Sequence, residues 1–253
     1  SLFLKQDGSL WAMGRNNYGQ LGTGTNYSSN SSNSPQLIKD ANVSHIASGT
    51  YHSLFIMNDG SLWTMGRNNY GQLGDGKTSS LYSPVKLNLK IPAVKIAAGE
   101  GHSLFVLADG SLWGMGRNSS GQLGTGKTSD HLCPRLIVDQ NISQIAAGNN
   151  HSLFTKQDGT LWAMGENYYG QLGDGTNSDK DYPVQVLDNS GTAHDGAIQV
   201  VAGDNHSLFL KQNGSVWGMG HNSYGQLGDE TKENRSSPVQ IFAGNVSRIA
   251  AGQ

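Results

Sequence analysis

The chain has 253 residues, of which 14% are charged and 35 are glycine. Average globular chains are about 25% charged and about 7% glycine, so this balance favours many tight turns over long helices. A net charge of −2 gives no attraction to phosphate backbones, and no apolar run approaches the length of a membrane span, so we expect neither nucleic acid nor membrane as a partner. The single cysteine, Cys133, excludes an internal disulfide.

One sequence unit recurs five times along the chain. It begins at Ser-Leu-Phe, continues through an Asp-Gly or Asn-Gly pair, Trp-x-Met-Gly, Gly-Gln-Leu-Gly and a proline, and ends in Ala-Gly or Ser-Gly. Internal repetition at this period is typical of blade-type folds. We therefore divide a single domain, residues 1–253, into repeats at about 1–51, 52–101, 102–150, 151–205 and 206–253.

The first repeat predicts four short strands, at Leu2–Lys5, Ser9–Gly14, Pro35–Ile38 and Val43–Ala47, because its apolar segments are short and bounded by glycine or proline. The Asp7-Gly8 pair predicts a two-residue hairpin turn with positive φ at both residues. The proline that opens the third strand predicts an outer edge, and the small residues that end the fourth predict an innermost position. Alternate residues such as Leu10 and Trp11 are apolar on both faces of the sheet, so we expect the tryptophans to hold neighbouring sheets together.

The fold that follows is an all-β, five-bladed β-propeller of four-stranded antiparallel blades. The chain starts where a second strand begins and stops just after an innermost strand. We therefore expect the strand near Val246–Ala251 to pair with the N-terminal blade and to close the ring.

The motifs His-Ser-Leu-Phe, Asp-Gly-Ser-Leu-Trp-x-Met-Gly and Gly-Gln-Leu-Gly, which together span the chain, resemble the repeat of the regulator of chromosome condensation family. The resemblance implies a β-propeller with a protein-binding face. Familiar members have seven blades, whereas this sequence has five repeats. Some members exchange nucleotide on the small GTPase Ran and touch chromatin, and bacterial members include secreted inhibitors of partner enzymes.

Three patterns suggest chemistry, and each has a plainer interpretation that we prefer. Gly71–Thr78 and Gly121–Thr128 match a P-loop, but no helix is predicted after either. A ring of recurring histidines could hold a metal, but the plainer interpretation is that each imidazole bonds the backbone of its own turn; they are His52, His102, His151 and His206. Asp174, Asp179 and Asp181 fit no calcium loop. We expect no enzyme activity, no cofactor and no metal.

Binding is expected where the repeats differ, because the shared residues are committed to packing. The turns before each histidine and the connectors after Gly-Gln-Leu-Gly should share one face. The connectors are Tyr27–Asn33, Lys77–Tyr82, Lys127–Cys133, Asn177–Tyr182 and Glu230–Ser237. The candidate residues of this face are Tyr51, Glu100, Asn149 and Asp204 in the turns, Arg15, Arg67, Arg117, Glu166 and His221 after Trp-x-Met-Gly, and Tyr18, Tyr70, Tyr169 and Tyr224 beside Gly-Gln-Leu-Gly.

The sequence thus predicts a non-enzymatic module for protein interaction or structural display, acting as a monomer. Three alternatives stay open: a glycan-binding propeller that uses the tyrosines, a guanine-nucleotide exchange factor, and an engineered or excised ring with no natural ligand. The longer Asn189–Ala197 segment is short for a nucleotide-expelling wedge and is interpreted as a surface insertion. Low charge and loops rich in Ser, Asn and Gly favour a bacterial secreted or surface protein.

Overall fold

The computed structural model of the chain describes residues 1–24 and 31–252, and within these ranges every helix or strand is a β-strand. The strands form five antiparallel sheets, which confirms the all-β prediction and the five blades of a β-propeller. The chain divides into two compact units, Ser1–Arg117 with Asp130–Leu136, and Asn118–Ser129 with Ile137–Gln253. Each unit is described by itself.

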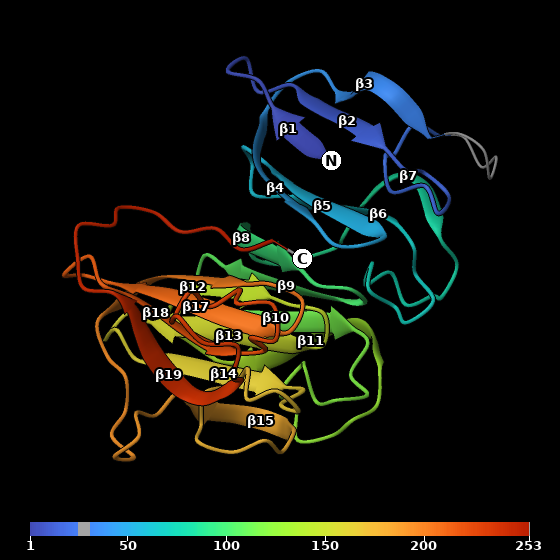
Figure 1. The fold of residues 1–253 in the computed structure, drawn as a ribbon. Helices are drawn as coiled ribbons and strands as arrows, with labels where there is room; N and C mark the ends of the chain where they lie inside the picture. The colour runs from blue at the N-terminus through green and yellow to red at the C-terminus, as the bar shows by residue number, and fades with distance from the viewer. Residues whose placement is uncertain (25–30, 253) are drawn as a thin grey trace. The chain divides into compact units, whose positions relative to one another are not determined.

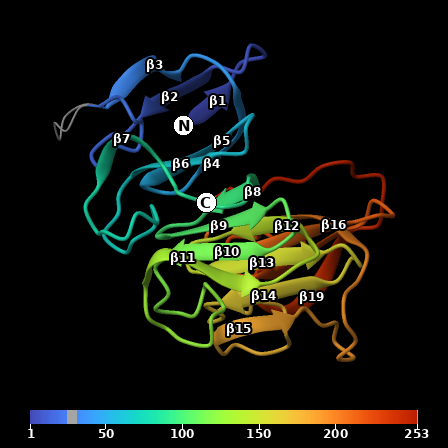
Figure 2. The same cartoon turned by 180° about the vertical axis from the view of Figure 1, so that it is seen from behind.

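The first unit holds three sheets (Figures 1 and 2). The first sheet consists of β1 (Leu2–Leu4), β2 (Leu10–Gly14) and β3 (Ser32–Lys39). The second consists of β4 (Val43–Ser48), β5 (His52–Met57), β6 (Leu62–Gly66) and β7 (Leu81–Lys86). The third consists of β8 (Ala93–Ala98), β9 (His102–Leu107), β10 (Leu112–Gly116) and β11 (His131–Val138), whose last two residues belong to the second unit.

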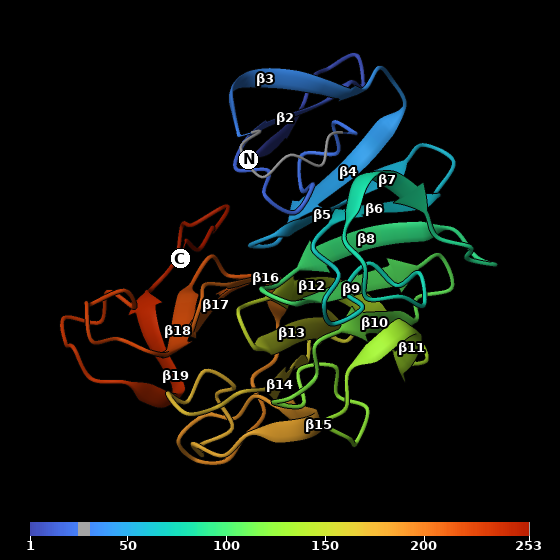
Figure 3. The ribbon, with the colours of Figure 1, turned by 90° about the vertical axis from the view of Figure 1, so that its right-hand side faces the viewer.

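The second unit holds two sheets, and Figure 3 shows the strands of the last one side by side. One sheet consists of β12 (Ile142–Ala147), β13 (His151–Lys156), β14 (Leu161–Gly165) and β15 (Lys180–Gln185). The other consists of β16 (Ala197–Ala202), β17 (His206–Lys211), β18 (Val216–Gly220) and β19 (Arg235–Phe242). In every four-stranded sheet the innermost strand comes from the end of the preceding repeat, as predicted.

The core lies between successive sheets and repeats from one pair to the next. Phe55 pairs with Trp63 across β5 and β6, and their rings stack with centroids 6.0 Å apart and 6° between the planes. On the third sheet the equivalent face carries Phe105 and Met115, which are fully buried against Leu54 and Leu62 of the second. Trp113 of the third sheet is partly buried against the same cluster of side chains. The prediction that tryptophans join neighbouring sheets is therefore confirmed.

The outer strand starts earlier than the proline predicted. β7 begins at Leu81, three residues before Pro84, and its pairing with β6 is irregular between Thr64 and Gly66. Pro84 falls in this irregular stretch, where a residue without an N–H costs no ladder bond. The predicted edge position is correct, because β7 is the last strand of its sheet.

The turn between the first two strands of a repeat is longer than the two residues predicted. The amide of Gly8 donates to the carbonyl of Lys5 at 3.0 Å, and the amide of Lys5 donates to the carbonyl of Ser9 at 3.1 Å. Only Gly8 has positive φ, at 80°, while the Asp7 carboxylate accepts the Ser9 amide at 2.9 Å. The loop is therefore a turn followed by a one-glycine bulge, in which the aspartate holds the strand after the turn.

The strand expected near Val246–Ala251 is absent, since residues 243–252 belong to no strand. The main-chain groups of Ile249 bond instead to the side chain of Gln199 on β16, at 3.1 and 2.9 Å. The side-chain amide of Gln199 thus connects this segment to β16, in place of the main-chain hydrogen bonds of a β-ladder. The first sheet has three strands, so the pairing predicted to close the ring is not among those of the described residues.

Candidate functional site

Tight turns between the first and second strands of the sheets carry the first group of predicted residues. Each turn is closed by a bond from a glycine amide to a histidine carbonyl, as from Gly49 to His52 at 2.9 Å. The carbonyl of Tyr51 then accepts the amide of Arg67 at 2.9 Å. Equivalent bonds of 2.8 to 2.9 Å bring Arg117, Glu166 and His221 to the turns of their own sheets. In these four sheets the turn and the residue after Trp-x-Met-Gly are therefore neighbours.

The Gly-Gln-Leu-Gly loop is built around a buried asparagine. Asn68 accepts the amide of Leu73 at 3.0 Å and donates to the Asp75 carboxylate at 2.9 Å. The side-chain oxygen of Gln72 accepts the amide of Tyr70 at 3.0 Å, which fixes the tyrosine beside the turn of the next sheet. The same asparagine–leucine bond recurs at Asn16, Asn118, Asn167 and Asn222.

The recurring histidines join successive sheets. His52 Nε2 lies 2.9 Å from Ser103 Oγ, and the Ser103 hydroxyl donates to the carbonyl of Gln72 at 2.8 Å. Since that hydroxyl proton is already used, His52 Nε2 is the donor to Ser103. His151 bonds to Ser207 in the same way in the second unit, at 2.9 Å.

Burial fixes the charge of these rings, because the charged form loses its hydration. It lowers the pKa of His52 to about 4 and the pKa of His151 to about 3, so both rings are neutral at pH 7. For His52 and His151 the predicted bond from the imidazole to the backbone of its own turn is wrong, since each ring reaches a serine of the next sheet. Within residues 1–24 and 31–252, no group of three or more His, Cys, Asp or Glu side chains could hold a metal.

Arginine and tyrosine side chains alternate along the turns of the first unit. The guanidinium carbon of Arg67 lies 5.3 Å from the ring centre of Tyr18 and 5.4 Å from those of Tyr51 and Tyr70. Arg15 lies 5.2 Å from the ring of Tyr51. We call these five residues, together with Arg117 and Glu100, the Arg–Tyr row.

The far end of the Arg–Tyr row holds its one ion pair. Arg117 lies 5.3 Å from the ring of Tyr70, and one of its terminal nitrogens donates to Glu100 Oε2 at 3.3 Å. Arg15 is exposed, whereas Arg67 is half-buried and its Nε is buried without a hydrogen-bond partner. Among the described residues, no carboxylate pairs with Arg15 or Arg67.

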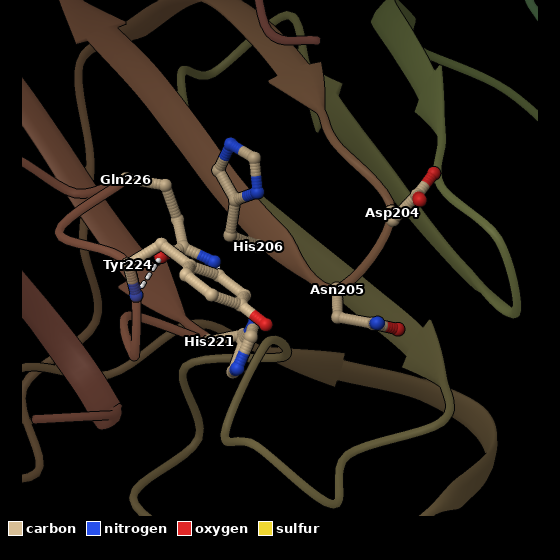
Figure 4. Close-up of a pocket in the computed structure, with 6 residues that line it drawn as sticks. All are labelled: Asp204, Asn205, His206, His221, Tyr224 and Gln226. Atoms are coloured by element: carbon tan, nitrogen blue, oxygen red, sulfur yellow. Dashed lines mark hydrogen bonds between the residues drawn. The ribbon is translucent and has the colours of Figure 1, made fainter. Parts of the chain in front are cut away.

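In the second unit the corresponding residues line a hollow of about 410 Å³ (Figure 4). Gln226 Nε2 donates to His221 Nδ1 at 2.8 Å, and Gln226 Oε1 accepts the amide of Tyr224 at 3.0 Å. The ring of Tyr169 lies 4.5 Å from that of His221, and Tyr224 is 86% exposed. Asp204, Asn205 and His206 complete the lining. The sequence did not single out Gln226, because it is repeated in every blade.

Two further predicted residues lie at the turns of the second unit. The amide of Asn149 donates to the carbonyl of Asp204 at 3.1 Å, so it contributes to the connection between turns. Glu166 is half-buried next to the turn of its own sheet. The connector Tyr27–Asn33 lies partly outside the described residues.

Sequence reasoning missed His194, which lies in the Asn189–Ala197 segment. Its ring is 6% exposed, lies 5.3 Å from the ring of Phe209 and 4.9 Å from that of Trp217, and leaves both nitrogens without partners. Burial and the nearby Lys211 lower its pKa. No motif surrounds this residue, so only its place in an otherwise polar insertion could have drawn attention to it.

The patterns that suggested chemistry are accounted for by structure. Lys127 and Thr128 are exposed and lead into β11 instead of a helix, so the P-loop match is a coincidence. Asp174 pairs with Lys180 at 3.2 Å, and Asp179 accepts the amide of Asn167 at 2.8 Å. Both carboxylates are thus used within their own loop.

Comparison with known proteins places these features in a family. The model of the RCC1-like domain matches residues 1–253. The X-linked retinitis pigmentosa GTPase regulator homolog of Caenorhabditis elegans is 41% identical over 90 residues, which cover 34% of this chain and 6% of that protein.

Two solved structures are similar over 99% of this chain. Human WBSCR16 has a TM-score of 0.84 and 26% identity, and 67% of that chain is covered. Prp20p from Saccharomyces cerevisiae has a TM-score of 0.81 and 25% identity, and 65% of that chain is covered.

This chain therefore spans about two thirds of the solved structures and a small part of the curated relative. Within the described ranges, no helix is long and apolar enough to cross a membrane. The repeated motifs, the four-stranded blades and the match over residues 1–253 show that the chain belongs to the RCC1-like domain family.

Proposed function

We propose that this chain is a non-catalytic protein-interaction module, and that each unit offers a binding surface beside its turns: the Arg–Tyr row in the first unit and the hollow around His221 in the second. The supporting relative is Prp20p, whose structure is described with its binding to Gsp1p and histones.

One observation carries the proposal: the arginine and tyrosine side chains of these surfaces, together with His221, are exposed or half-buried, whereas most of the repeated polar side chains inside the blades are buried. His52, Asn68 and Gln72 are 0% exposed and serve the fold. Tyr224 is 86% exposed and Arg15 is exposed, yet neither is needed for a buried hydrogen bond of the blades. Aromatic and arginine side chains are the residue types enriched where proteins bind proteins.

Quantitative affinity purification with paired variants tests the proposal. The surface variant combines Arg67→Gln with Tyr224→Ser, one change in each unit. The matched control combines Arg135→Gln with Phe242→Ser, which removes the same charge and an exposed aromatic ring from the outer strands β11 and β19. A partner kept by the wild type and the control but lost by the surface variant is the expected result.

Loss of the same partner from both variants, or retention by both, would reject the surface. Circular dichroism and thermal unfolding of each variant establish beforehand that the fold is intact.

A glycan-binding function draws support from the hollow around His221, since exposed tyrosine beside polar groups can stack on a sugar ring. A glycan-binding propeller of this kind would have one site in each blade. The third blade differs, because Ser120 and Arg117 stand there in place of Tyr224 and His221. A glycan array probed with wild type and Tyr224→Ser tests this candidate.

The nucleotide-exchange alternative predicts faster release of labelled GDP from a small GTPase. The Asn189–Ala197 segment is its natural candidate for a wedge. The segment is a short loop, closed by bonds from the Ser190 and Thr192 amides to the Asp188 carboxylate, each 2.8 Å long.

We further propose that the 253 residues act as one monomeric domain, since β11 begins in one unit and ends in the other. A bacterial secreted or surface origin stays a prediction from composition. The relatives described above come from eukaryotes.

A further inference from the structure

The Arg–Tyr row holds two cations that have no carboxylate partner in the part of the chain that the structure describes. Arg15 and Arg67 both lie on the ring of Tyr51, with guanidinium carbons 5.2 and 5.4 Å from its centre. Their guanidinium carbons are therefore roughly 11 Å apart at most, which is close to the Debye length of about 10 Å at 0.1 M salt. Two like charges this close repel each other, and an anion bound between them would relieve that repulsion.

Stacking on tyrosine leaves each guanidinium ready to bind an anion. A ring covers the flat face of the guanidinium, while the N–H groups lie in its plane and at its edge. Arg67 is held against three rings, those of Tyr18, Tyr51 and Tyr70, so little side-chain freedom is left to lose on binding. Its Nε is buried and has no partner.

The chain shows which anion the row accepts. Arg117 stacks on Tyr70 as its neighbours stack on their rings, and it donates to the carboxylate of Glu100 at 3.3 Å. A glutamate thus pairs with one arginine of the row, whereas among the described residues no carboxylate pairs with the other two. Carboxylate is also the group that the planar guanidinium fork matches, with two parallel N–H donors.

From this we propose that the Arg–Tyr row binds an extended acidic segment of a partner protein, with carboxylates at every second or third residue contacting Arg67 and Arg15. An extended chain rises about 3.3 Å per residue, so side chains two or three residues apart are separated by roughly 7 to 10 Å, which fits the spacing of the arginines. The inference rests on the proposed protein-binding function and specifies the chemistry of its partner.

Fluorescence anisotropy with defined peptides tests the inference. The probe is a labelled ten-residue peptide of alternating Glu and Ser, and the matched peptide has Gln in place of Glu. We expect the Glu peptide alone to bind, with an affinity that falls as salt is raised. Arg67→Gln and Arg15→Gln are expected to weaken binding about tenfold each, because each removes a charge-assisted hydrogen bond. Arg135→Gln, which removes the same charge from β11, is expected to leave affinity unchanged.

A gain of affinity gives the sharpest result, because loss of folding cannot produce it. Glu100→Gln removes the one negative charge of the Arg–Tyr row, so this variant is expected to bind the Glu peptide several-fold more tightly than the wild type. Unchanged or weaker binding by Glu100→Gln would overturn the inference, and so would equal binding of the Gln peptide.

The remaining comparisons separate this inference from the function on which it rests. If a ten-nucleotide dT oligonucleotide binds more tightly than the Glu peptide and depends equally on Arg67, the ligand of the row is a phosphate backbone. That result would reject an acidic protein segment as the partner. If the Glu peptide fails to bind while a purified partner still depends on Arg67 and Tyr224, the acidic class is rejected and protein binding stands.

Discussion

Lowering the pH from 7 to 4.5 is expected to destabilise the protein through its buried histidines. Burial lowers the pKa of His52 from 6.5 to about 4 and that of His151 to about 3. Above pH 6.5 neither the folded nor the unfolded chain protonates these rings, so the folded state has its full stability there. As the pH falls below 6.5 the unfolded chain gains protons that the folded chain excludes, and stability decreases until the folded pKa is reached. Each of the two histidines is therefore expected to lower the free energy of unfolding by about 2 to 3 kcal/mol between pH 7 and pH 4.5.

Urea unfolding followed by tryptophan fluorescence measures this loss, because the tryptophans are half-buried beside the cores between sheets. His52→Gln keeps an N–H donor near the position of Nε2 and does not titrate. Its stability is therefore expected to change with pH by about 2 to 3 kcal/mol less than that of the wild type. The carboxyl groups with lowered pKa, such as that of Asp59, lose their contribution as the pH falls through 3.8, below this window. An equal pH dependence in the wild type and His52→Gln would refute the reasoning.

Three further predictions concern the fold. Gly49→Ala adds a methyl group that would overlap the Gly99 carbonyl and the His52 ring, so urea unfolding should show a loss of about 1 to 3 kcal/mol. Gly252→Ala meets nothing within 4 Å and should stay within about 0.5 kcal/mol of the wild type. Asn68→Ala removes the acceptor of the buried Leu73 amide and should lower the stability by about 2 to 3 kcal/mol. Asn69 is exposed, so Asn69→Ala should lower it little, and thermal unfolding of the two variants tests the difference. Calorimetry should show one cooperative transition for both units, and two separate transitions would contradict the single domain.

The fold was predictable because its repeating residues act locally. Because Leu62 and Trp63 alternate along β6, Leu62 packs toward the third sheet and Trp63 toward the first. Pro84 indicates an edge strand whatever its exact position in the pairing with β6. The conformation of the Asp7-Gly8 turn was not predictable from its glycine alone. It depends on the carboxylate of Asp7, which captures the amide of Ser9.

Candidate residues for binding could be named from the sequence, but the contacts among them could not. Arg15, Tyr51 and Arg67 were each singled out, yet no local pattern predicts that arginines from two repeats stack on a single tyrosine. The hydrogen-bond partner predicted for His52 was wrong for the same reason, since its actual partner, Ser103, belongs to the next sheet. His194 gave no signal, because burial of a histidine in an insertion depends on aromatic rings distant in sequence.

Hydrogen–deuterium exchange of the protein bound to its captured partner tests the central claim most directly. We expect slower exchange at residues 48–52 and 66–72, which hold the turn and the loop beside the Arg–Tyr row, and no change at the hairpin turn 58–60, which links the other ends of β5 and β6. Protection confined to that hairpin turn, or to the outer strand β7, would place the partner elsewhere and contradict the proposed surface.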